Sequence, residues 1–169
     1  MGRSGYSDGC DNDWSLICYR GAVKSAIRGK RGQAFLREML AAMDALPEKR
    51  LISGDLVFEG HPEFPYPHPE EDIIVGGDQL VTGGGVPVRI GEVCAIGSVG
   101  LARGVDMSKL DPEDPETVAD TFGIATAMAR EIVYENDESV YYAETPEQRF
   151  MRMRAWIVGN LKGDIDASH

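Results

Sequence analysis

"VADTFGIATAMAREI", residues 118–132, is the segment on which the architecture of this chain depends. Two helical patterns meet there at Gly123, and small Ala119 lies four residues earlier, where two helices can cross closely. Apolar side chains recur at helical spacing on both sides of the glycine and are expected to face the core: Val118, Phe122, Ile124, Met128 and Ile132. The segment therefore predicts a helix, a glycine turn and a second helix, with the shape of a helix-turn-helix.

Segments of this shape commonly read DNA, so residues 115–134 give one functional hypothesis, a DNA-binding regulator. Arg130 is the only cation among the positions expected to be exposed on the second helix, which are Thr126, Ala127, Arg130, Glu131 and Tyr134. The flanks are acidic, with DPEDPE at residues 111–116 and YENDE at residues 134–138. Because phosphate contacts supply most of the affinity for DNA, the composition favours a hairpin that packs the core and displays negative charge.

Further helices are predicted on either side of this hairpin. Asp13 caps a helix over residues 13–27, and the glycines of RGKRG, residues 28–32, end it. Residues 33–47 give the cleanest core face, and a last helix begins at a capping box formed by Thr145 and Gln148. The apolar stripes of these three helices are Trp14, Ile17, Cys18, Val23, Ala26 and Ile27; Phe35, Leu36, Met39, Leu40, Met43 and Leu46; and Phe150, Met153, Ile157 and Leu161.

Residues 91–104 carry one more helical pattern, in which Gly97 and Gly100 would let a neighbouring helix approach closely. Asp114 is the expected N-cap of the hairpin's first helix, with Pro115 in the first turn. We therefore expect a mainly α fold, in which residues 1–169 form a single compact helical domain of five to six helices.

Residues 56–91 differ in kind and predict a Pro/Gly-rich β-hairpin insertion within the helical domain. GHPEFPYPHPEED, residues 60–72, holds four prolines and cannot be helical. The following residues alternate short β-branched runs with glycines, which predicts short strands near residues 73–75, 79–82 and 86–90.

The charge of the chain is strongly negative and uneven. The formal net charge is -11, with +3 on residues 1–50 and -14 on residues 51–169. An acidic body repels nucleic acid and suits a partner protein with a basic surface. No apolar run is long enough for a membrane span and no signal peptide is visible, so we expect a cytoplasmic protein without membrane contact. The sequence is also compatible with a homodimer.

Acidic and aromatic side chains form the predicted interaction surface, and basic ones form the surface that the DNA hypothesis needs. The first set is Glu63, Phe64, Tyr66, Glu70, Glu71, Asp72, Glu113, Asp114, Glu135, Asp137 and Glu138. The second set is Arg28, Lys30, Arg31, Thr126 and Arg130. The basic cluster around RGKRG is alternatively a solvated loop or an internal partner for the acidic half.

Catalytic and metal-binding patterns are not recognisable. His61 and His68 flank PEFPYP beside several glutamates, but their spacing matches no standard ligand pattern, so no metal is expected. The three cysteines form no CxxC pair, and Cys18 and Cys94 are expected to be small core residues. There is no nucleophile motif, so we expect neither an enzyme nor a cofactor.

Several longer strings together resemble a family of small uncharacterised proteins of tailed bacteriophages and prophages. They include RGAVKSAIRGKRGQAFLREMLAAMDALPEKRLI, GEVCAIGSVGLARGVDM and LDPEDPETVADTFGIATAMAREIVYENDE, and the resemblance omits residues 56–91. It implies a phage accessory protein inside a bacterial host cell. By analogy, it suggests an inhibitor of a defence system of the anti-CRISPR or anti-restriction type. We therefore predict a non-enzymatic protein that binds a host protein through acidic surfaces, with the DNA-binding regulator as the alternative.

Overall fold

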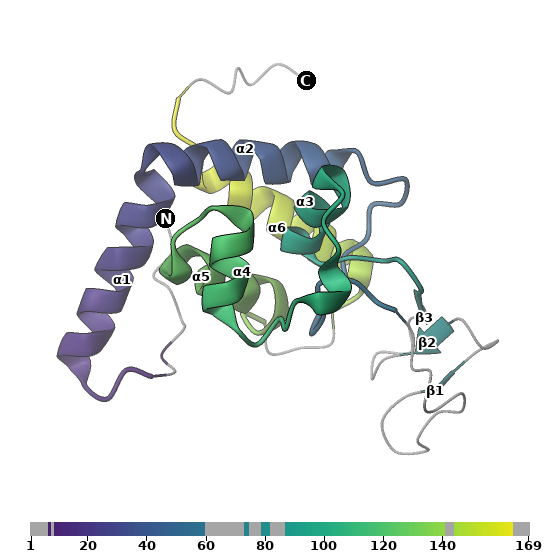
Figure 1. Ribbon diagram of the computed structural model, residues 1–169, viewed down its shortest axis with the longest axis horizontal. Helices are drawn as coiled ribbons and strands as arrows, with labels where there is room; N and C mark the ends of the chain where they lie inside the picture. Colours follow the sequence, from purple (N-terminus) through teal and green to yellow (C-terminus); the bar gives the residue numbers. More distant parts are fainter. Residues whose placement is uncertain are drawn as a thin grey trace.

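The computed structural model describes residues 7, 9–59, 73–74, 79–81, 87–140 and 144–163. These residues form a mainly α structure in a single compact domain, as predicted (Figure 1). The α-helices are α1 (Asp13–Arg28), α2 (Lys30–Asp44), α3 (Ala95–Arg103), α4 (Pro115–Phe122), α5 (Thr126–Asp137) and α6 (Pro146–Asn160), and a 3-10 turn, η1 (Met107–Lys109), follows α3.

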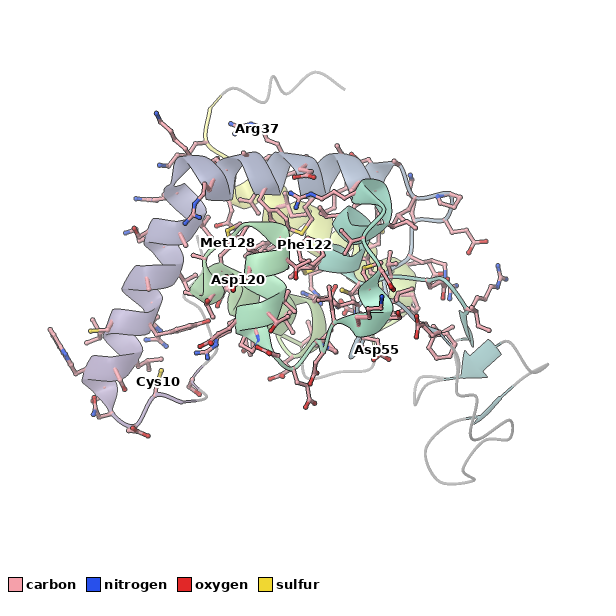
Figure 2. All side chains as sticks on the ribbon, in the orientation of Figure 1. Cys10, Arg37, Asp55, Asp120, Phe122 and Met128 are labelled. Carbon is pink, nitrogen blue, oxygen red and sulfur yellow. The ribbon has the colours of Figure 1, made fainter. Side chains whose placement is uncertain are left out.

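The predicted helical hairpin is present, and it occupies the middle of the molecule. Gly123 ends α4 in the left-handed conformation, with φ of 71°, which glycine adopts without steric cost. The Ile124 N–H donates to the Ala119 carbonyl at 3.0 Å, which closes the turn. All five predicted core side chains of the hairpin are buried. The Phe122 ring meets Phe35 of α2 edge-on, with centroids 6.2 Å apart (Figure 2).

The second helix of the hairpin is surrounded by other helices. α5 contacts α4, α1, α3 and α6, and each of its residues is buried or half-buried. The prediction of an exposed face on α5 is therefore wrong. Glu131 in particular is 3% exposed and lies within hydrogen-bonding distance of the Tyr19 hydroxyl on α1. The reason is that α1, remote in sequence, and α6, the next helix along the chain, cover the flanks that a local pattern leaves open.

A sharp corner at Gly29 joins α1 and α2, where a five-residue loop was predicted. α2 begins at Lys30, three residues earlier than expected, and so includes Gly32. A Cβ on Gly32 would lie 2.0 Å from the Ala26 carbonyl oxygen, so the close approach of the two helices requires glycine there. The α1 cap also differs from the prediction, because Asn12 rather than Asp13 accepts from the Ser15 N–H.

Half of the predicted core stripe of α1 is exposed instead. Trp14 is 72% exposed, Ile17 is 58% exposed, and the thiol-bearing Cys18 is exposed as well. Val23 and Ile27, by contrast, are buried. Figure 1 shows why: α1 meets the N-terminal end of α2 and extends from there along one side of the molecule, so only one of its faces meets the body. The predictions of a core position for Trp14, Ile17 and Cys18 are wrong.

The strands lie where the sequence predicted them and form one antiparallel sheet. β1 (Ile73–Ile74), β2 (Gln79–Val81) and β3 (Pro87–Arg89) follow one another in that order, with residue 74 opposite 80 and residue 80 opposite 88. Between residues 56 and 91, residues 60–72, 75–78 and 82–86 lie outside the described structure. The ends of this segment belong to the core, since Leu56, Phe58 and Val88 are buried.

The two glycines of α3 were predicted to allow close packing of a neighbouring helix, but other segments pack against them. A Cβ on Gly97 would lie 1.9 Å from the Leu56 carbonyl oxygen, and one on Gly100 would lie 2.3 Å from the Met107 sulfur. Gly97 thus lets the backbone near residue 56 lie directly against α3. Cys94 is buried at the start of this helix, as predicted, and burial raises the pKa of its thiol to about 12.

The predicted start of α6 and the face of α2 that covers it are confirmed. The Thr145 hydroxyl accepts from the Gln148 N–H at 3.1 Å, and the Gln148 side chain accepts from the Thr145 N–H at 3.0 Å. Phe150, Met153 and Ile157 are buried beneath α2. Every apolar residue predicted for the α2 face is buried except Leu40, which is half-buried against the same core.

Candidate functional site

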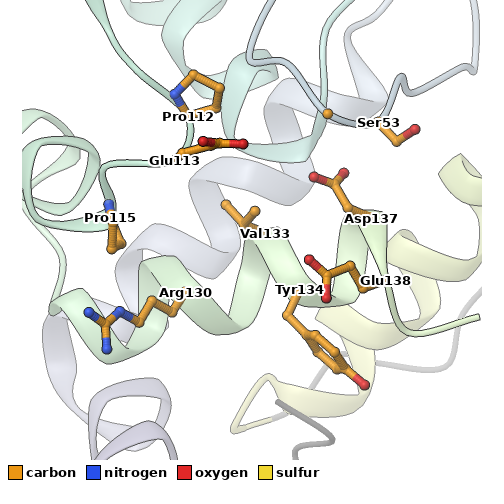
Figure 3. Close-up of a pocket in the computed structure, with 10 residues that line it drawn as sticks. Ser53, Pro112, Glu113, Pro115, Arg130, Val133, Tyr134, Asp137 and Glu138 are labelled. Carbon is orange, nitrogen blue, oxygen red and sulfur yellow. The ribbon is translucent and has the colours of Figure 1, made fainter. Parts of the chain in front are cut away.

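A half-open cleft of about 510 Å³ lies between α5 and two connecting segments (Figure 3). One wall is the Ser53–Gly54 turn that follows α2, and the other is the loop that leads into α4. Its volume is in the range of pockets that hold a small molecule or a few residues of a peptide. The lining residues are Ser53, Gly54, Pro112, Glu113, Pro115, Arg130, Val133, Tyr134, Asp137 and Glu138.

One stripe of α5 forms the floor of this cleft. Arg130, Val133 or Tyr134, and Asp137 recur at spacings of three and four residues, which places them on one face of a helix. Arg130 stands at the end nearest Pro115, while Asp137 and Glu138 stand at the opposite end (Figure 3). Seven residues of helix separate Arg130 from Asp137 by about 10 Å. The cleft is therefore dipolar along its length.

Asp137 is held by backbone and side-chain donors at the acidic end. Its carboxylate accepts from the Asn136 side chain at 2.6 Å and from the Gly54 N–H. Burial nevertheless raises the pKa of Asp137, and the nearby negative charge of Asp55 acts in the same direction, against the attraction of Arg149. The ionised carboxylate thus carries an unrelieved desolvation cost, which a cation in the cleft would reduce.

Arg130 lies at the other end of the cleft, and the described part of the chain offers it no ion-pair partner. Its Nε is buried and has no hydrogen-bond acceptor, and the described residues place no carboxylate in an ion pair with it. An arginine in an acidic protein is normally paired, because a buried donor without an acceptor costs free energy. The side chain therefore lines the cleft as a cation that no carboxylate of the described residues neutralises.

The predicted acidic and aromatic residues of the interaction surface have different positions in the structure. Glu113, Asp137 and Glu138 line the same cleft, although Glu113 lies 24 residues before Asp137 in the sequence. Asp114 caps α4 by accepting from the Glu116 and Thr117 N–H groups, and its bonds with Thr117 lower its pKa. Glu135 is half-buried, and burial with the adjacent Glu131 raises its pKa. The others lie outside the described residues: Glu63, Phe64, Tyr66, Glu70, Glu71 and Asp72, together with His61 and His68.

The residues that the DNA hypothesis needs do not share one exposed helix face. Arg28, Lys30 and Arg31 are exposed at the corner between α1 and α2. Thr126 is half-buried on α5, as is Arg130 in the cleft. A recognition helix must enter the major groove, which is about 12 Å wide, and α5 is enclosed by neighbouring helices.

Sequence reasoning missed the walls of the cleft. Ser53 and Gly54 come from a turn with no recognisable motif, in which Gly54 has φ of 86°. Helical spacing along α5 could have grouped Arg130, Val133 and Asp137. Nothing local, however, indicates that the segment after α2 folds back onto the end of α5.

Replacing Asp137 with asparagine is expected to stabilise the protein at pH 7. Because the folded pKa of Asp137 lies above its unfolded value, near 3.9, stability is lost as the pH rises between the two values. The gain of Asp137→Asn in melting temperature should therefore shrink as the pH falls from 7 to 3.5. Thermal unfolding across this range measures it, with Asp120→Asn on the exposed side of α4 as the control. An Asp137→Asn gain that does not change with pH would contradict this assignment.

Comparison with protein-family models, with curated proteins and with solved structures finds no match for the chain. Within the described residues, no helix has the length and apolar character needed to cross a membrane. The same part of the chain brings together no group of three or more His, Cys, Asp or Glu side chains suited to hold a metal ion.

Proposed function

We propose that this protein is a non-enzymatic binding protein that docks on a basic surface of a host protein and receives a cationic segment of it in the cleft. One observation carries the proposal. The acidic stretches 111–116 and 134–138, at the two outer ends of the helical hairpin, contribute Glu113, Asp137 and Glu138 to the same cleft. A lysine or arginine of the partner would lie among these three carboxylates.

Electrostatics supports a cationic partner both at long range, through the net charge, and at short range, within the cleft. The net charge of -11 attracts a basic surface before contact and accelerates encounter. Within the cleft, a cation relieves the desolvation cost of Asp137, while the exposed Glu113 and Glu138 complete its environment. Arg130 would then donate to a main-chain carbonyl or carboxylate of the same segment, which fixes its direction across the cleft.

The class of partner follows from charge and from the resemblance to phage proteins. Surfaces that hold nucleic acid are basic, and an acidic protein can occupy them in its place. We therefore propose a nucleic-acid-handling component of a bacterial defence system, CRISPR or restriction, as the partner in the host cytoplasm. A DNA-binding regulator remains the alternative, but the enclosed position of α5 disfavours it.

The experiment compares two double variants that remove the same charge. Glu113→Gln with Glu138→Gln alters the cleft, whereas Glu116→Gln with Asp120→Asn removes two exposed acids of α4 outside it. Calorimetry measures binding to short peptides that contain arginine, with citrulline analogues as the uncharged comparison. Recovery of a stoichiometric partner from infected-host lysate is then compared among the same proteins.

We expect the cleft variant to lose at least about tenfold in affinity for arginine peptides, and the α4 variant to stay within about twofold of the original chain. Equal losses in both variants would show that net charge alone drives binding and would contradict the cleft. A shift of phage operator DNA at micromolar protein in a gel assay would instead support the regulator.

A further inference from the structure

The outer face of α1 is exposed and carries a second regular pattern, which the functional cleft does not use. Its residues follow steps of four, three, four and three, which is the spacing of a coiled-coil seam. They lie opposite the buried Val23 and Ile27 and are all exposed in the structure: Trp14, Cys18, Gly21, Ser25 and Arg28. Asp11 is exposed as well and lies just before the helix, whose N-cap is Asn12. Ile17 flanks the same seam and is 58% exposed.

We propose that this face pairs with the same face of a second copy, with the two α1 helices antiparallel about a two-fold axis. The axis crosses the seam midway between Cys18 and Gly21. Reversal about this point places Trp14 opposite Ser25 of the second copy, while Cys18 meets its Gly21. It also brings Asp11, just before the helix, near Arg28 of the second copy. Each contact occurs twice, as a symmetric interface requires.

The sizes of the side chains fit this arrangement. The large side chain of the seam, Trp14, lies toward the N-terminal end of α1, and the small residues Gly21 and Ser25 lie toward the C-terminal end. A Cβ built on Gly21 would meet no atom within 4 Å, so the space over this glycine is open in a single copy. In the antiparallel pair, the indole of each helix covers the small-residue half of the other.

The distribution of charge along α1 also favours antiparallel pairing with a second copy of the helix. Acidic Asp13 lies in the first turn of the helix and Asp11 lies just before it, whereas basic Lys24 and Arg28 lie near its end. Antiparallel pairing brings each acidic end beside the basic end of the other copy, and the two helix dipoles oppose one another favourably. A parallel pair would place like charges together. The face is therefore complementary to itself, which identifies a second copy as its occupant.

The size of the contact sets the expected strength. α1 has 16 residues and so a length of about 24 Å, and one helix pair buries less than a standard interface of roughly 1,600 Å². We expect a reversible dimer with a dissociation constant on the order of micromolar to tens of micromolar. The seam shares no residue with the cleft, so this inference and the proposed function fail independently.

Sedimentation velocity over 1–200 µM full-length protein tests the dimer. We expect Arg28→Asp to weaken association by roughly tenfold, because an aspartate at position 28 would lie near Asp11 of the other copy in both symmetry-related contacts. The double variant Asp11→Arg, Arg28→Asp should restore association, because it exchanges the two charges. Gly21→Gln is expected to abolish the dimer although it favours the helix within one copy. Gly159→Gln, at an exposed and equally open glycine of α6, is the matched control and should leave association unchanged.

Cysteine cross-linking provides a separate readout of the geometry. In a Cys10→Ser background, the two copies of Cys18 lie near the axis, so a short bismaleimide should link them in the original seam and not in Gly21→Gln. A chain that stays monomeric to 200 µM would overturn the proposal. It would also be overturned if the charge-swapped double variant did not recover association, or if Gly159→Gln lost as much association as Gly21→Gln.

Discussion

Replacing Arg152 with methionine is expected to lower the free energy of unfolding by about 3 kcal/mol, because it leaves a buried carboxylate without its main partner. Arg152 on α6 grips both oxygens of Glu144, at 2.7 and 2.9 Å, and the Glu144 side chain is only 3% exposed. Among the described residues, Arg149 is the other cation near Glu144, with its Nε 3.5 Å from a carboxylate oxygen. The Arg152 guanidinium also donates to the Asn136 carbonyl at 3.2 Å, so the end of α5 loses a partner too.

Arg154→Met is the matched control for this prediction. Arg154 lies two residues along α6 and makes the same two-pronged pair with Asp44, at 2.8 and 3.0 Å. The side chains of this pair are 46% and 41% exposed, so the loss should stay below about 1 kcal/mol. Chemical denaturation of both variants compares the two pairs directly. Similar losses would show that burial does not decide the strength of these ion pairs.

The elements that the sequence predicts well are those whose signals are local. Gly123 needs a positive φ to end α4, and the Thr145 and Gln148 box starts α6, so both are set by a few neighbouring residues. The α2 face is also confirmed, because its apolar spacing is regular over the full helix. Local periodicity reports which residues share a face, and here it reports this correctly.

Periodicity does not tell which neighbour covers a face, and the errors have this origin. Trp14 and Ile17 have the spacing of core residues but lie on the side of α1 that no element of the described chain covers. Glu131 was expected in solvent and is enclosed by helices that come from both ends of the chain. The cleft could not be predicted from the sequence for the same reason, because its walls come from separate segments that only the tertiary fold brings together.

Replacing Gly32 with alanine is expected to cost about 3 kcal/mol, although alanine is the better helix former. The added methyl group would lie 2.0 Å from the Ala26 carbonyl oxygen and 3.0 Å from the Ile27 carbonyl oxygen. These are backbone atoms of α1, which cannot move aside as a flexible side chain does. The corner at Gly29 must therefore open, and α1 must separate from the flank of α5 that it covers.

Gly159→Ala gives the opposite sign at a helical glycine with open space around it. No atom lies within 4 Å of a Cβ built there, so the substitution should stabilise α6 by up to about 1 kcal/mol. Denaturation measures both changes, and hydrogen exchange of α1 shows whether the corner has opened. Destabilisation of Gly32→Ala without faster hydrogen exchange in α1 would contradict the clash. Faster exchange in α1 would show that the absence of a side chain at Gly32 is what allows α1 to pack against the rest of the domain.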